Sequence, residues 1–226
     1  MIIITGSSMG IGRFLTEKFR SDNIPVYGTY LNNPPVEASA YFSKVNISDF
    51  NEIVEWFYKI KPQLKNVVLL NCAAINYNCY AHKSDLSKWH EVIHINLIGT
   101  FNMIRAILPF MREQNYGRII NFSSILAQRG VVGTSAYAAS KAALWGMAKS
   151  IAAENAGKNI TINNLNLGYF SVGMIEQVPE ELQNELKKTI PSGEFGNPED
   201  IYRAVRFLMD STYINGASID INGGLI

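Results

Sequence analysis

Short apolar runs of strand length alternate with longer segments of helical period along the chain. MIIIT is followed by IGRFLTEKFRS, then come PVYGTY and YFSKV, and DFNEIVEWFYKI precedes NVVLLN. The second half repeats the pattern, with helices expected over 87–113, about 136–156 and 198–209, among the runs GRIINFSS, NITINNLNL and GASIDING. Strands that alternate with helices form a parallel sheet covered on both faces. We therefore predict a single α/β domain over residues 1–226, doubly wound, with a mostly parallel sheet of about seven strands flanked by helices.

One crossover is too short for a helix. Between PVYGTY and YFSKV lie only residues 31–40, LNNPPVEASA, which contain two adjacent prolines. Proline removes a backbone donor and interrupts helices. The sequence therefore predicts a turn or a short irregular segment at this crossover.

Composition and charge exclude several classes of function. The chain of 226 residues is 47% hydrophobic and 17% charged, as is typical of a compact folded protein, and its net charge is +1. A protein whose main task is nucleic-acid binding needs a basic excess to neutralise phosphates, so we expect no nucleic-acid partner. The apolar run at the N-terminus is too short to span a bilayer and carries no basic segment. We therefore expect neither export nor a membrane partner.

Cysteine and histidine usage indicates neither a disulfide framework nor a metal centre. Cys72 and Cys79 are the two cysteines of the chain, and their number and spacing fit neither disulfides nor a zinc site. This usage is typical of a reducing compartment, so we expect a cytoplasmic protein. His90 and His94 could share one face of an expected helix. Because no third ligand accompanies them, we predict no metal site.

A glycine-rich turn, TGSSMGIG at residues 5–12, follows the first expected strand and precedes the first expected helix. Gly6 lets the chain turn sharply, Gly10 lets the backbone approach a pyrophosphate, and Gly12 allows close packing of the helix, whose N-terminus offers N–H groups to phosphates. This placement predicts a Rossmann-type dinucleotide site, and the alternative is a glycine-rich turn without a ligand. The predicted cofactor contacts in this turn are Gly6, Ser8, Met9, Gly10, Ile11 and Gly12.

The NCAA stretch at residues 71–74 ends the fourth expected strand. Ligands of open α/β sheets lie beyond the carboxyl ends of the strands. Asn71, Ala73 and Ala74 are therefore predicted to line the cofactor crevice. The alternative is that small residues at this strand end serve packing alone.

Tyr137 and Lys141 lie four residues apart at the start of an alanine-rich segment, thirteen residues after Ser124. On a helix the two share a face, one turn apart. A phenol is a poor acid–base catalyst at neutral pH, but a nearby ammonium favours the phenolate and lowers the pKa of the phenol. Ser124 closes the preceding strand, where its hydroxyl could hold a substrate oxygen beside the tyrosine. The alternative is a surface tyrosine and a solvated lysine.

Together these motifs resemble those of the short-chain dehydrogenase/reductase family, in particular its 3-oxoacyl-carrier-protein-reductase-like members, over essentially the whole chain. The family's glycine motif matches TGSSMGIG, and its central-helix asparagine matches Asn96 in INLIGTF. Its catalytic serine matches Ser124, and its Y-x-x-x-K matches Tyr137 and Lys141. PSGEFGNPEDIYRAVRFLMD and GASIDINGG are similar to the family's last helix and strand. The resemblance implies hydride transfer between a nicotinamide and a carbonyl or secondary alcohol.

In the scheme that the resemblance implies, Tyr137 is the acid for reduction and the base for oxidation. Lys141 lowers the pKa of the tyrosine and binds the nicotinamide ribose. Ser124 orients the substrate oxygen, and Asn96 supports a water-linked proton relay through Lys141. One alternative is a catalytically silent, dinucleotide-binding regulator of the same fold. A sugar-nucleotide epimerase or dehydratase would need a larger C-terminal part.

Some positions depart from the family's pattern. The glycine of its N-A-G is Ala74, the acidic residue that faces adenine is Asn46, and its P-G-x-x-x-T reads LGYFSV at residues 167–172. An amide can still hydrogen-bond to adenine, and the backbone of Val172 could still contact the nicotinamide carboxamide. These departures keep the regulator hypothesis open. The resemblance adds further cofactor contacts: Asn46, Ile47, Gly168, Val172, Tyr137 and Lys141.

Cofactor preference depends on the end of the second expected strand. A preference for NAD usually requires an Asp or Glu there to bond the ribose 2′-hydroxyl. Residues 28–33 read GTYLNN, without a carboxylate, so Tyr30 and Asn32 could bond a 2′-phosphate. Arg13 could reach the same phosphate, although a solvated first-turn arginine is an equal alternative, and the family's other basic position is Met9. We therefore expect NADP(H) to be favoured over NAD(H).

The resemblance also places a substrate lid at about residues 170–192 and implies a small-molecule carbonyl or alcohol as substrate. Its pocket mouth is expected over 125–134 and 168–190, where the first segment contributes Ile125, Leu126, Gln128 and Arg129. Relatives commonly form oligomers through their long helices and C-terminal edge. We therefore expect a homo-oligomer, a tetramer or a dimer, whose close helix approach is permitted by Ala138, Ala139, Ala142 and Ala143.

Overall fold

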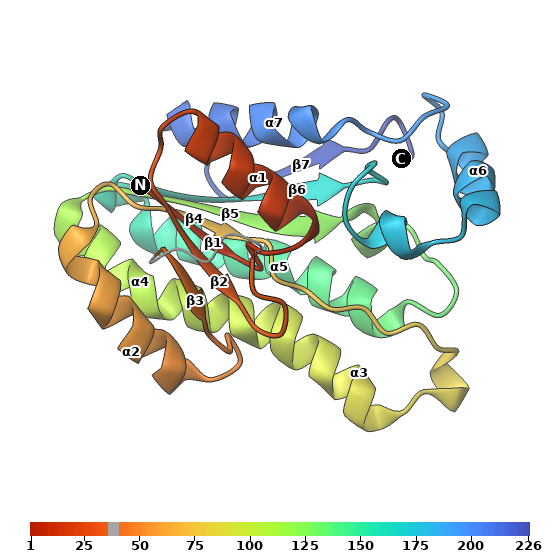
Figure 1. Cartoon of the computed structure of the whole chain (residues 1–226), viewed down its shortest axis with the longest axis horizontal. Helices are drawn as coiled ribbons and strands as arrows, with labels where there is room; N and C mark the ends of the chain where they lie inside the picture. Colours follow the sequence, from red (N-terminus) through yellow and green to blue (C-terminus); the bar gives the residue numbers. More distant parts are fainter. Residues whose placement is uncertain (36–40) are drawn as a thin grey trace.

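The computed structural model describes residues 1–35 and 41–226, and within them the chain forms seven strands and seven α-helices (Figure 1). The strands are β1 Ile2–Thr5, β2 Val26–Tyr30, β3 Phe42–Lys44, β4 Val68–Asn71, β5 Gly117–Ser124, β6 Ile160–Leu167 and β7 Ser218–Ile221. The helices are α1 Gly10–Ser21, α2 Phe50–Ile60, α3 Leu86–Ile93, α4 Thr100–Gln114, α5 Ser135–Asn155, α6 Glu180–Thr189 and α7 Pro198–Asp210. This order confirms the predicted alternation of strands and helices.

The strands form one sheet in the order β3-β2-β1-β4-β5-β6-β7, and every pair of neighbours is parallel. The direction of winding reverses between β1 and β4, which is the switch point of a doubly wound sheet. All residues of β1, β4, β5 and β6 are buried, because helices cover both faces of the sheet. The predicted fold class is confirmed.

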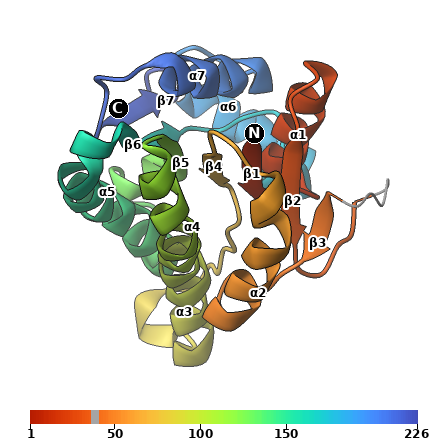
Figure 2. The ribbon, with the colours of Figure 1, turned by 90° about the vertical axis from the view of Figure 1, so that its left-hand side faces the viewer.

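Helices cover both faces of the sheet (Figure 2), and an apolar layer holds them on each face. On one face, Ile3 and Leu69 of the strands belong to the same buried cluster as Met103 of α4, together with side chains of α2 and α5. On the other face, Ile4 packs in a cluster with Val205 of α7 and with side chains of α1. Successive residues of a strand point to opposite faces, so β1, β2, β4, β5 and β6 each contribute to both layers.

The helix predicted over 87–113 is a continuous rod, Leu86–Gln114, with an internal change of period. α3 and α4 are joined by a π-helical stretch, His94–Gly99, that contains Asn96. Such stretches often occur at functional sites. The rod is long and apolar enough to cross a membrane by length and composition, but inward residues such as Met103 are fully buried against the sheet. Packing in the core accounts for the apolar character of its inward face, which makes up 39% of the apolar window.

The crossover between β2 and β3 contains no helix in its described part. Residues 31–35 form bends and extended chain, and residues 36–40 of the predicted irregular segment lie outside the described residues. β2 and β3 pair in parallel, with Gly28 opposite Phe42. Glycine is required there because a Cβ on Gly28 would lie 2.6 Å from the Phe42 ring. This close approach holds the edge strand β3 against β2.

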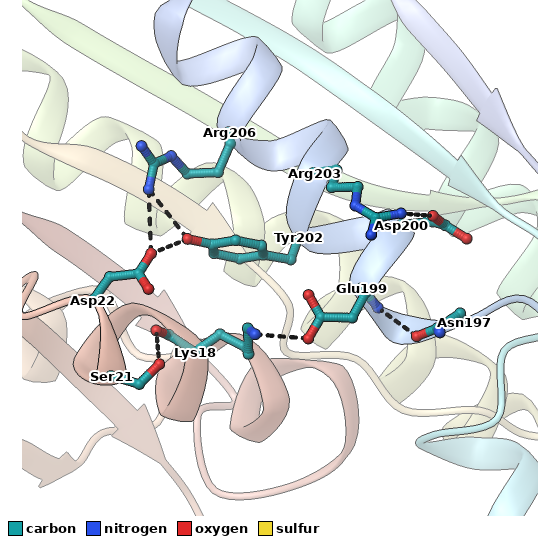
Figure 3. Close-up of polar contacts among 9 residues, drawn as sticks. All are labelled: Lys18, Ser21, Asp22, Asn197, Glu199, Asp200, Tyr202, Arg203 and Arg206. Carbon is teal, nitrogen blue, oxygen red and sulfur yellow. Dashed lines mark hydrogen bonds and ion pairs between the residues drawn. The ribbon is translucent and has the colours of Figure 1, made fainter.

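Polar contacts join α7 to the end of α1 (Figure 3). Tyr202 of α7 donates a hydrogen bond to Asp22, which follows α1, and Lys18 pairs with Glu199 at 2.7 Å. The ring of Tyr202 also packs on Phe19, with the ring centroids 5.0 Å apart. The helix that begins at the glycine-rich turn is thus held at its far end by the last helix of the chain.

Candidate active site and cofactor crevice

Strand ends deliver the predicted site residues to one edge of the sheet. Thr5 ends β1 and pairs in register with Asn71, which ends β4. Ser124 ends β5 and pairs in register with Leu167, which ends β6. Because ligands of doubly wound sheets bind at this edge, beside the switch point, the structure brings the glycine-rich turn, the NCAA stretch and Ser124 together where a dinucleotide would lie.

The glycine-rich turn is a cradle of backbone with no room for side chains. Gly6 and Gly10 have positive φ angles of 64° and 51°. A Cβ on Gly6 would lie 2.9 Å from the Cα of Ala73, and one on Gly12 would lie 2.2 Å from the carbonyl oxygen of Gly6. Met9 caps α1 without a side-chain hydrogen bond, so the N–H groups of the first turn stay available to an anion. The residues present therefore fit a dinucleotide pyrophosphate.

The remaining predicted contacts of this turn differ in exposure. Met9 is half exposed, and Ser8 and Ile11 are partly exposed beside it. Ser7, which the sequence reasoning passed over, is buried and donates from its hydroxyl to the carbonyl of Thr29 at 3.1 Å. The turn is therefore fastened to β2 as well as to β1.

The NCAA stretch packs directly against the glycine-rich turn. The N–H of Ala73 donates to Thr5 Oγ1 at 3.0 Å, and Ala73 and Ala74 are partly exposed at the crevice. The side chain of Asn71 instead lies within the sheet, where its amide donates to Asn121 at 2.9 Å. Asn71 Oδ1 is buried without a hydrogen-bond partner in the described part of the chain. Within this stretch, Asn71 therefore serves packing inside the sheet, whereas Ala73 and Ala74 lie at the crevice.

Ser124 and Tyr137 form a hydroxyl pair between the end of β5 and the first turn of α5. Hydrogen bonding by Ser124 acts to lower the pKa of Tyr137, and Ser124 Oγ accepts from the N–H of Leu126 at 3.2 Å. Burial raises the pKa of Tyr137 to about 12, against the opposing effect of the Ser124 hydrogen bond. The phenol is therefore protonated at neutral pH, as a proton donor to a substrate oxygen must be.

Lys141 lies one turn after Tyr137 and is 3% exposed, which excludes a solvated lysine. Its Nζ donates to the carbonyl of Phe122 at 2.7 Å and lies 5.6 Å from the centre of the Tyr137 ring. Burial lowers the pKa of Lys141 to about 8, against the opposing effect of the Cys72 thiol. Burial penalises the charged form of both groups and is the first cause of both shifts. The expectation that Lys141 lowers the pKa of the tyrosine stays a prediction.

Asn96 joins three segments with its side chain. Its Oδ1 accepts from the N–H of Ile75 at 2.9 Å, and its Nδ2 donates to the carbonyl of Ile75 at 2.9 Å and to Ser140 Oγ at 3.1 Å. Hydrogen bonds of Asn96 thereby join the π-helical turn, the chain after β4 and helix α5. Both amide protons are used, so Asn96 holds the site in place and its side chain has no proton left to donate to a water.

The adenosine side of the crevice carries no carboxylate at the end of β2. Tyr30 is partly buried and Asn32 is exposed. The neighbouring Asn33 reaches the sulfur of Met9, with Nδ2 2.8 Å from Sδ. Arg13 pairs with Glu17 of the next turn at 2.7 Å, on an exposed face of α1. The structure thus matches the alternative in which Arg13 is a solvated first-turn arginine.

Asn46 and Ile47 follow β3 and face different surroundings. Asn46 Oδ1 accepts from the N–H of Ser48 at 3.0 Å, which forms a local turn. Ile47 is buried against the long helix, where a Cβ on Gly99 would lie 2.8 Å from its side chain. The absence of a side chain at Gly99 lets this segment pack on the helix beside the π-helical turn.

The predicted nicotinamide contacts lie at the end of β6. Gly168 approaches Asn222 closely, since a Cβ on Gly168 would lie 2.8 Å from the Cα of Asn222. Val172 packs against the apolar layer that α1 and α7 cover. Ser171 bonds through its N–H to the carbonyl of Gly196 at 3.2 Å. Position 172 has no threonine hydroxyl, so only the backbone of Val172 could make the contact that the family's threonine makes with the nicotinamide carboxamide.

The segment predicted as a lid leaves the sheet and returns over the glycine-rich turn. It contains a 3-10 turn, Met174–Gln177, and α6, which has no buried residue. Gly173 has a φ of 89°, and a Cβ on Gly10 would lie 3.0 Å from the Cα of Gly173. The N–H of Gly173 donates to Glu176 at 3.0 Å. The predicted lid therefore touches the phosphate cradle directly.

Within residues 1–35 and 41–226, no group of three or more His, Cys, Asp or Glu side chains is placed to hold a metal ion. Cys72 and Cys79 are free thiols, and burial raises the pKa of Cys72.

Two side chains that hold α5 in place, those of Ser140 and Trp145, were not identified from the sequence. The available signal for Trp145 is its position four residues after Lys141, which puts both on neighbouring turns of one helix.

Comparison with known proteins agrees with this geometry. A family model described as enoyl-(acyl carrier protein) reductase matches residues 6–226. The chain is 35% identical over 232 residues to an acetoacetyl-CoA reductase of Shinella zoogloeoides, covering 98% of this chain and 96% of the relative. It is 33% identical over 237 residues to the 3-oxoacyl-acyl-carrier-protein reductase FabG of Thermotoga maritima, covering 99% and 96%. The corresponding protein of Haemophilus influenzae is 32% identical over 233 residues, with 99% and 96% covered.

Proposed function

Because the chain belongs to the short-chain dehydrogenase/reductase family of nicotinamide-dependent oxidoreductases, we propose that it reduces a ketone carbonyl with NADP(H). The observation that carries the proposal is the Ser124–Tyr137 hydroxyl pair, one helical turn from the buried Lys141. The proposed substrate class is a 3-oxoacyl thioester, since two relatives that match over their full length are named as reductases of acetoacetyl-CoA and of 3-oxoacyl-acyl carrier protein.

The residues of this chain hold the carbonyl oxygen and supply its proton. A bound nicotinamide would supply the hydride to the carbonyl carbon. Ser124 Oγ accepts the N–H of Leu126, so its own proton is free to bond the substrate oxygen. Tyr137 then transfers its phenolic proton to that oxygen, which yields the alcohol and leaves a phenolate. The Lys141 ammonium, one helical turn away, stabilises this phenolate.

Four features support the cofactor assignment. The glycine-rich turn and the N-terminus of α1 would hold the pyrophosphate, Lys141 the nicotinamide ribose, and the backbone near Gly168 and Val172 the carboxamide. The end of β2 has no carboxylate to repel a 2′-phosphate, which supports NADP(H) over NAD(H). Tyr30 and Asn32 are the proposed partners of that phosphate, without help from the Glu17-paired Arg13.

An apolar mouth supports an acyl substrate. Ile125, after the catalytic serine, shares a buried cluster with Ile190 of the lid segment and with Leu225 near the C-terminus. Leu126, Tyr169 and Phe195 pack against the same cluster. This buried cluster joins the loop after Ser124 to the proposed lid of about residues 170–192 and makes that side of the proposed carbonyl site apolar.

The test begins with fluorescence titrations of the purified protein with NADPH and NADH, followed by assays with acetoacetyl and crotonyl thioesters. We expect tighter binding of NADPH and its oxidation with the acetoacetyl thioester. Tyr137→Phe should abolish turnover and preserve NADPH binding, whereas Tyr58→Phe, at an exposed position, should change neither. Oxidation of NADPH with the crotonyl thioester alone would overturn the carbonyl assignment in favour of enoyl reduction.

A second candidate, a silent dinucleotide-binding regulator, rests on Ala74, Leu167 and Val172, where the family's pattern is changed. Cofactor binding without turnover on any carbonyl, unaltered by Tyr137→Phe, would favour it. The proposal of catalysis is preferred because the Ser124–Tyr137 pair and the buried Lys141 would have no use in a binding protein.

We also propose a homotetramer or dimer in a reducing cytoplasm. The free thiols of Cys72 and Cys79 support the compartment. Small residues on α5, Ala139 among them, support close contact between helices of two copies. Light scattering of the purified protein decides the assembly, and a monomeric mass would contradict it.

A further inference from the structure

A network of polar side chains lies behind the catalytic residues, on the side of the sheet that α5 covers; its inner members are buried or half-buried, and its outer members, Gln128 and Asp220, are exposed. Its centre is Trp145, whose indole N–H donates to Ser123 Oγ at 3.0 Å and to Asn166 Oδ1 at 2.9 Å. Ser123 is on β5 and Asn166 on β6, and the two are paired in register. The indole therefore spans two neighbouring strands from one helix.

At one end this network holds Lys141. The hydroxyl of Ser123 donates to the backbone carbonyl of Lys141 at 3.0 Å. The ammonium of Lys141 donates to the carbonyl of Phe122, the residue before Ser123, at 2.7 Å. Lys141 is thus fixed at its backbone and at its charged end by two consecutive residues of β5, which directly precede Ser124.

At the other end the network holds the loop after the catalytic serine. Asn166 Nδ2 donates to Asp220 Oδ1 at 2.7 Å, and Gln128 Nε2 donates to the same oxygen at 3.1 Å. Asp220 is on the edge strand β7 and is paired in register with Asn166. Gln128 also bonds through its N–H to the carbonyl of Ile125 at 2.9 Å. The sequence reasoning assigned Gln128 to the pocket mouth, but its side chain turns to β7.

The hydrogen bonds of the network have one consistent direction. An indole N–H can only donate, a carboxylate can only accept, and the amide of Asn166 does one of each between them. Bonds to an ionised carboxylate are stronger than those between neutral groups. Asp220 is therefore the anionic anchor toward which the amides of Asn166 and Gln128 are turned.

We propose that Trp145 and Asp220 are positioning residues: Trp145 sets the position of Lys141, and Asp220, through Gln128, sets the loop that follows Ser124. This proposal rests on the proposed reductase function. Because the two ends touch different parts of the site, they affect different kinetic constants. Trp145 governs turnover, and Asp220 governs the KM of the carbonyl substrate.

The first test compares Asp220→Ala, Asp220→Asn and Gln128→Ala with the wild-type enzyme. Asp220→Ala raises the KM of the acetoacetyl thioester roughly tenfold and leaves kcat within about twofold, since the loop is loosened while the proton donor stays in place. Gln128→Ala reproduces this effect, and the double variant adds nothing further because the two side chains form one contact. Asp220→Asn, which keeps the accepting oxygen, restores most of the affinity.

The matched control is Ser218→Ala. Ser218 lies two residues before Asp220 on the same strand and face, and its hydroxyl accepts from Asn164 of β6 at 3.1 Å, but it contacts no element of the site. This variant leaves both kinetic constants unchanged. All variants are compared at equal oligomeric state, measured by light scattering.

The second test concerns Trp145→Phe, which keeps an aromatic ring and removes the indole N–H. It lowers kcat roughly tenfold, leaves the KM of the thioester unchanged and shifts the alkaline limb of the pH–rate profile. A loss of thermal stability with unchanged kcat and an unchanged pH profile would show that Trp145 is a packing residue.

Hydrogen exchange supplies a readout that does not need activity. Asp220→Ala increases amide exchange in the peptide over residues 125–134, and Ser218→Ala does not. Unchanged exchange in this peptide overturns the role of Asp220 whether or not the protein is a reductase. Increased exchange in Asp220→Ala, together with a wild-type protein that reduces no carbonyl, would uphold the network and refute the proposed function.

Discussion

At the scale of single residues, the chemistry of the site depends on burial as much as on residue type. The pKa of Tyr137 is raised to about 12 and that of Lys141 is lowered to about 8, and burial is the first cause of both shifts. Burial favours the neutral form of each group. The site therefore combines a phenol that keeps its proton at neutral pH with an amine that loses its positive charge at about pH 8.

The titration of Lys141 predicts an alkaline limit on carbonyl reduction. The pKa of Lys141 lies at about 8 instead of its ordinary 10.5, so its positive charge is present below about pH 8 and is lost as the pH rises through that value. Since the ammonium stabilises the phenolate left by proton transfer, kcat should fall above about pH 8. A pH–rate profile checks this, and kcat constant up to about pH 10 would contradict it.

Among the buried amides, Asn121 should be the most sensitive to replacement. It is fully buried in the middle of a row in which Asn71 donates to Asn121 at 2.9 Å and Asn121 donates to Asn164 at 3.1 Å. Asn121→Ala leaves a donor on Asn71 and an acceptor on Asn164 without partners, which should cost about 2–4 kcal/mol of unfolding free energy. Urea unfolding measures this, with exposed Ser150→Ala as the control.

At the scale of elements, glycine positions decide how closely the turn, the strand ends and the lid segment approach one another. Gly10 combines a φ of 51° with a contact to Gly173 of the lid segment, whose own φ is 89°. A side chain at either position would be strained and would separate the two segments. The backbone of the glycine-rich turn therefore packs directly against the backbone of the proposed lid.

Gly10→Ala should lower NADPH affinity by about tenfold or more, because its Cβ would lie 3.0 Å from the Cα of Gly173 and its φ would be strained. The control is Gly146→Ala on α5, where a Cβ has nothing within 4 Å. That variant should raise the unfolding free energy by about 0.5–1 kcal/mol and leave binding unchanged. Equal NADPH dissociation constants for Gly10→Ala and the wild-type protein would show that the cradle tolerates a side chain.

The same scale shows what could be inferred from sequence. Hydrophobic periodicity and the placement of TGSSMGIG predicted the strand–helix order and the glycine-rich turn, and the long helix was predicted within one residue of Leu86–Gln114 at each end. Its π-helical change of period at His94–Gly99 was not predicted, since it depends on the bonds that Asn96 makes to Ile75 and Ser140. Those partners are distant in sequence.

At the scale of the whole molecule, α7, the last helix of the chain, packs on α1, the helix that starts at the glycine-rich turn. Its contacts are of two kinds. Tyr202 and Arg206 bond to Asp22 at a partly exposed surface, and the Tyr202 ring packs on the fully buried Phe19. Exposed ion pairs contribute little, whereas burial of an aromatic ring contributes more. The packing should therefore carry most of the stability of this contact.

Two substitutions separate these contributions. Asp22→Ala should lower the unfolding free energy by about 1 kcal/mol or less, because salt and water screen the contact. Tyr202→Ala should lower it by about 2–4 kcal/mol, because the ring is removed from Phe19. Chemical denaturation measures both, and a larger loss for Asp22→Ala would show that the polar contact dominates the docking of α7.

The sequence by itself determined the fold class and the identities of the candidate catalytic residues. Strand–helix periodicity and the spacing of Ser124, Tyr137 and Lys141 are local properties of the chain. The tertiary structure decided the pKa direction of Tyr137, the use of the Asn96 side chain within the scaffold and the turn of Gln128 toward Asp220. Burial and hydrogen bonding depend on segments far apart in sequence, and they exist only once the sheet has brought those segments together.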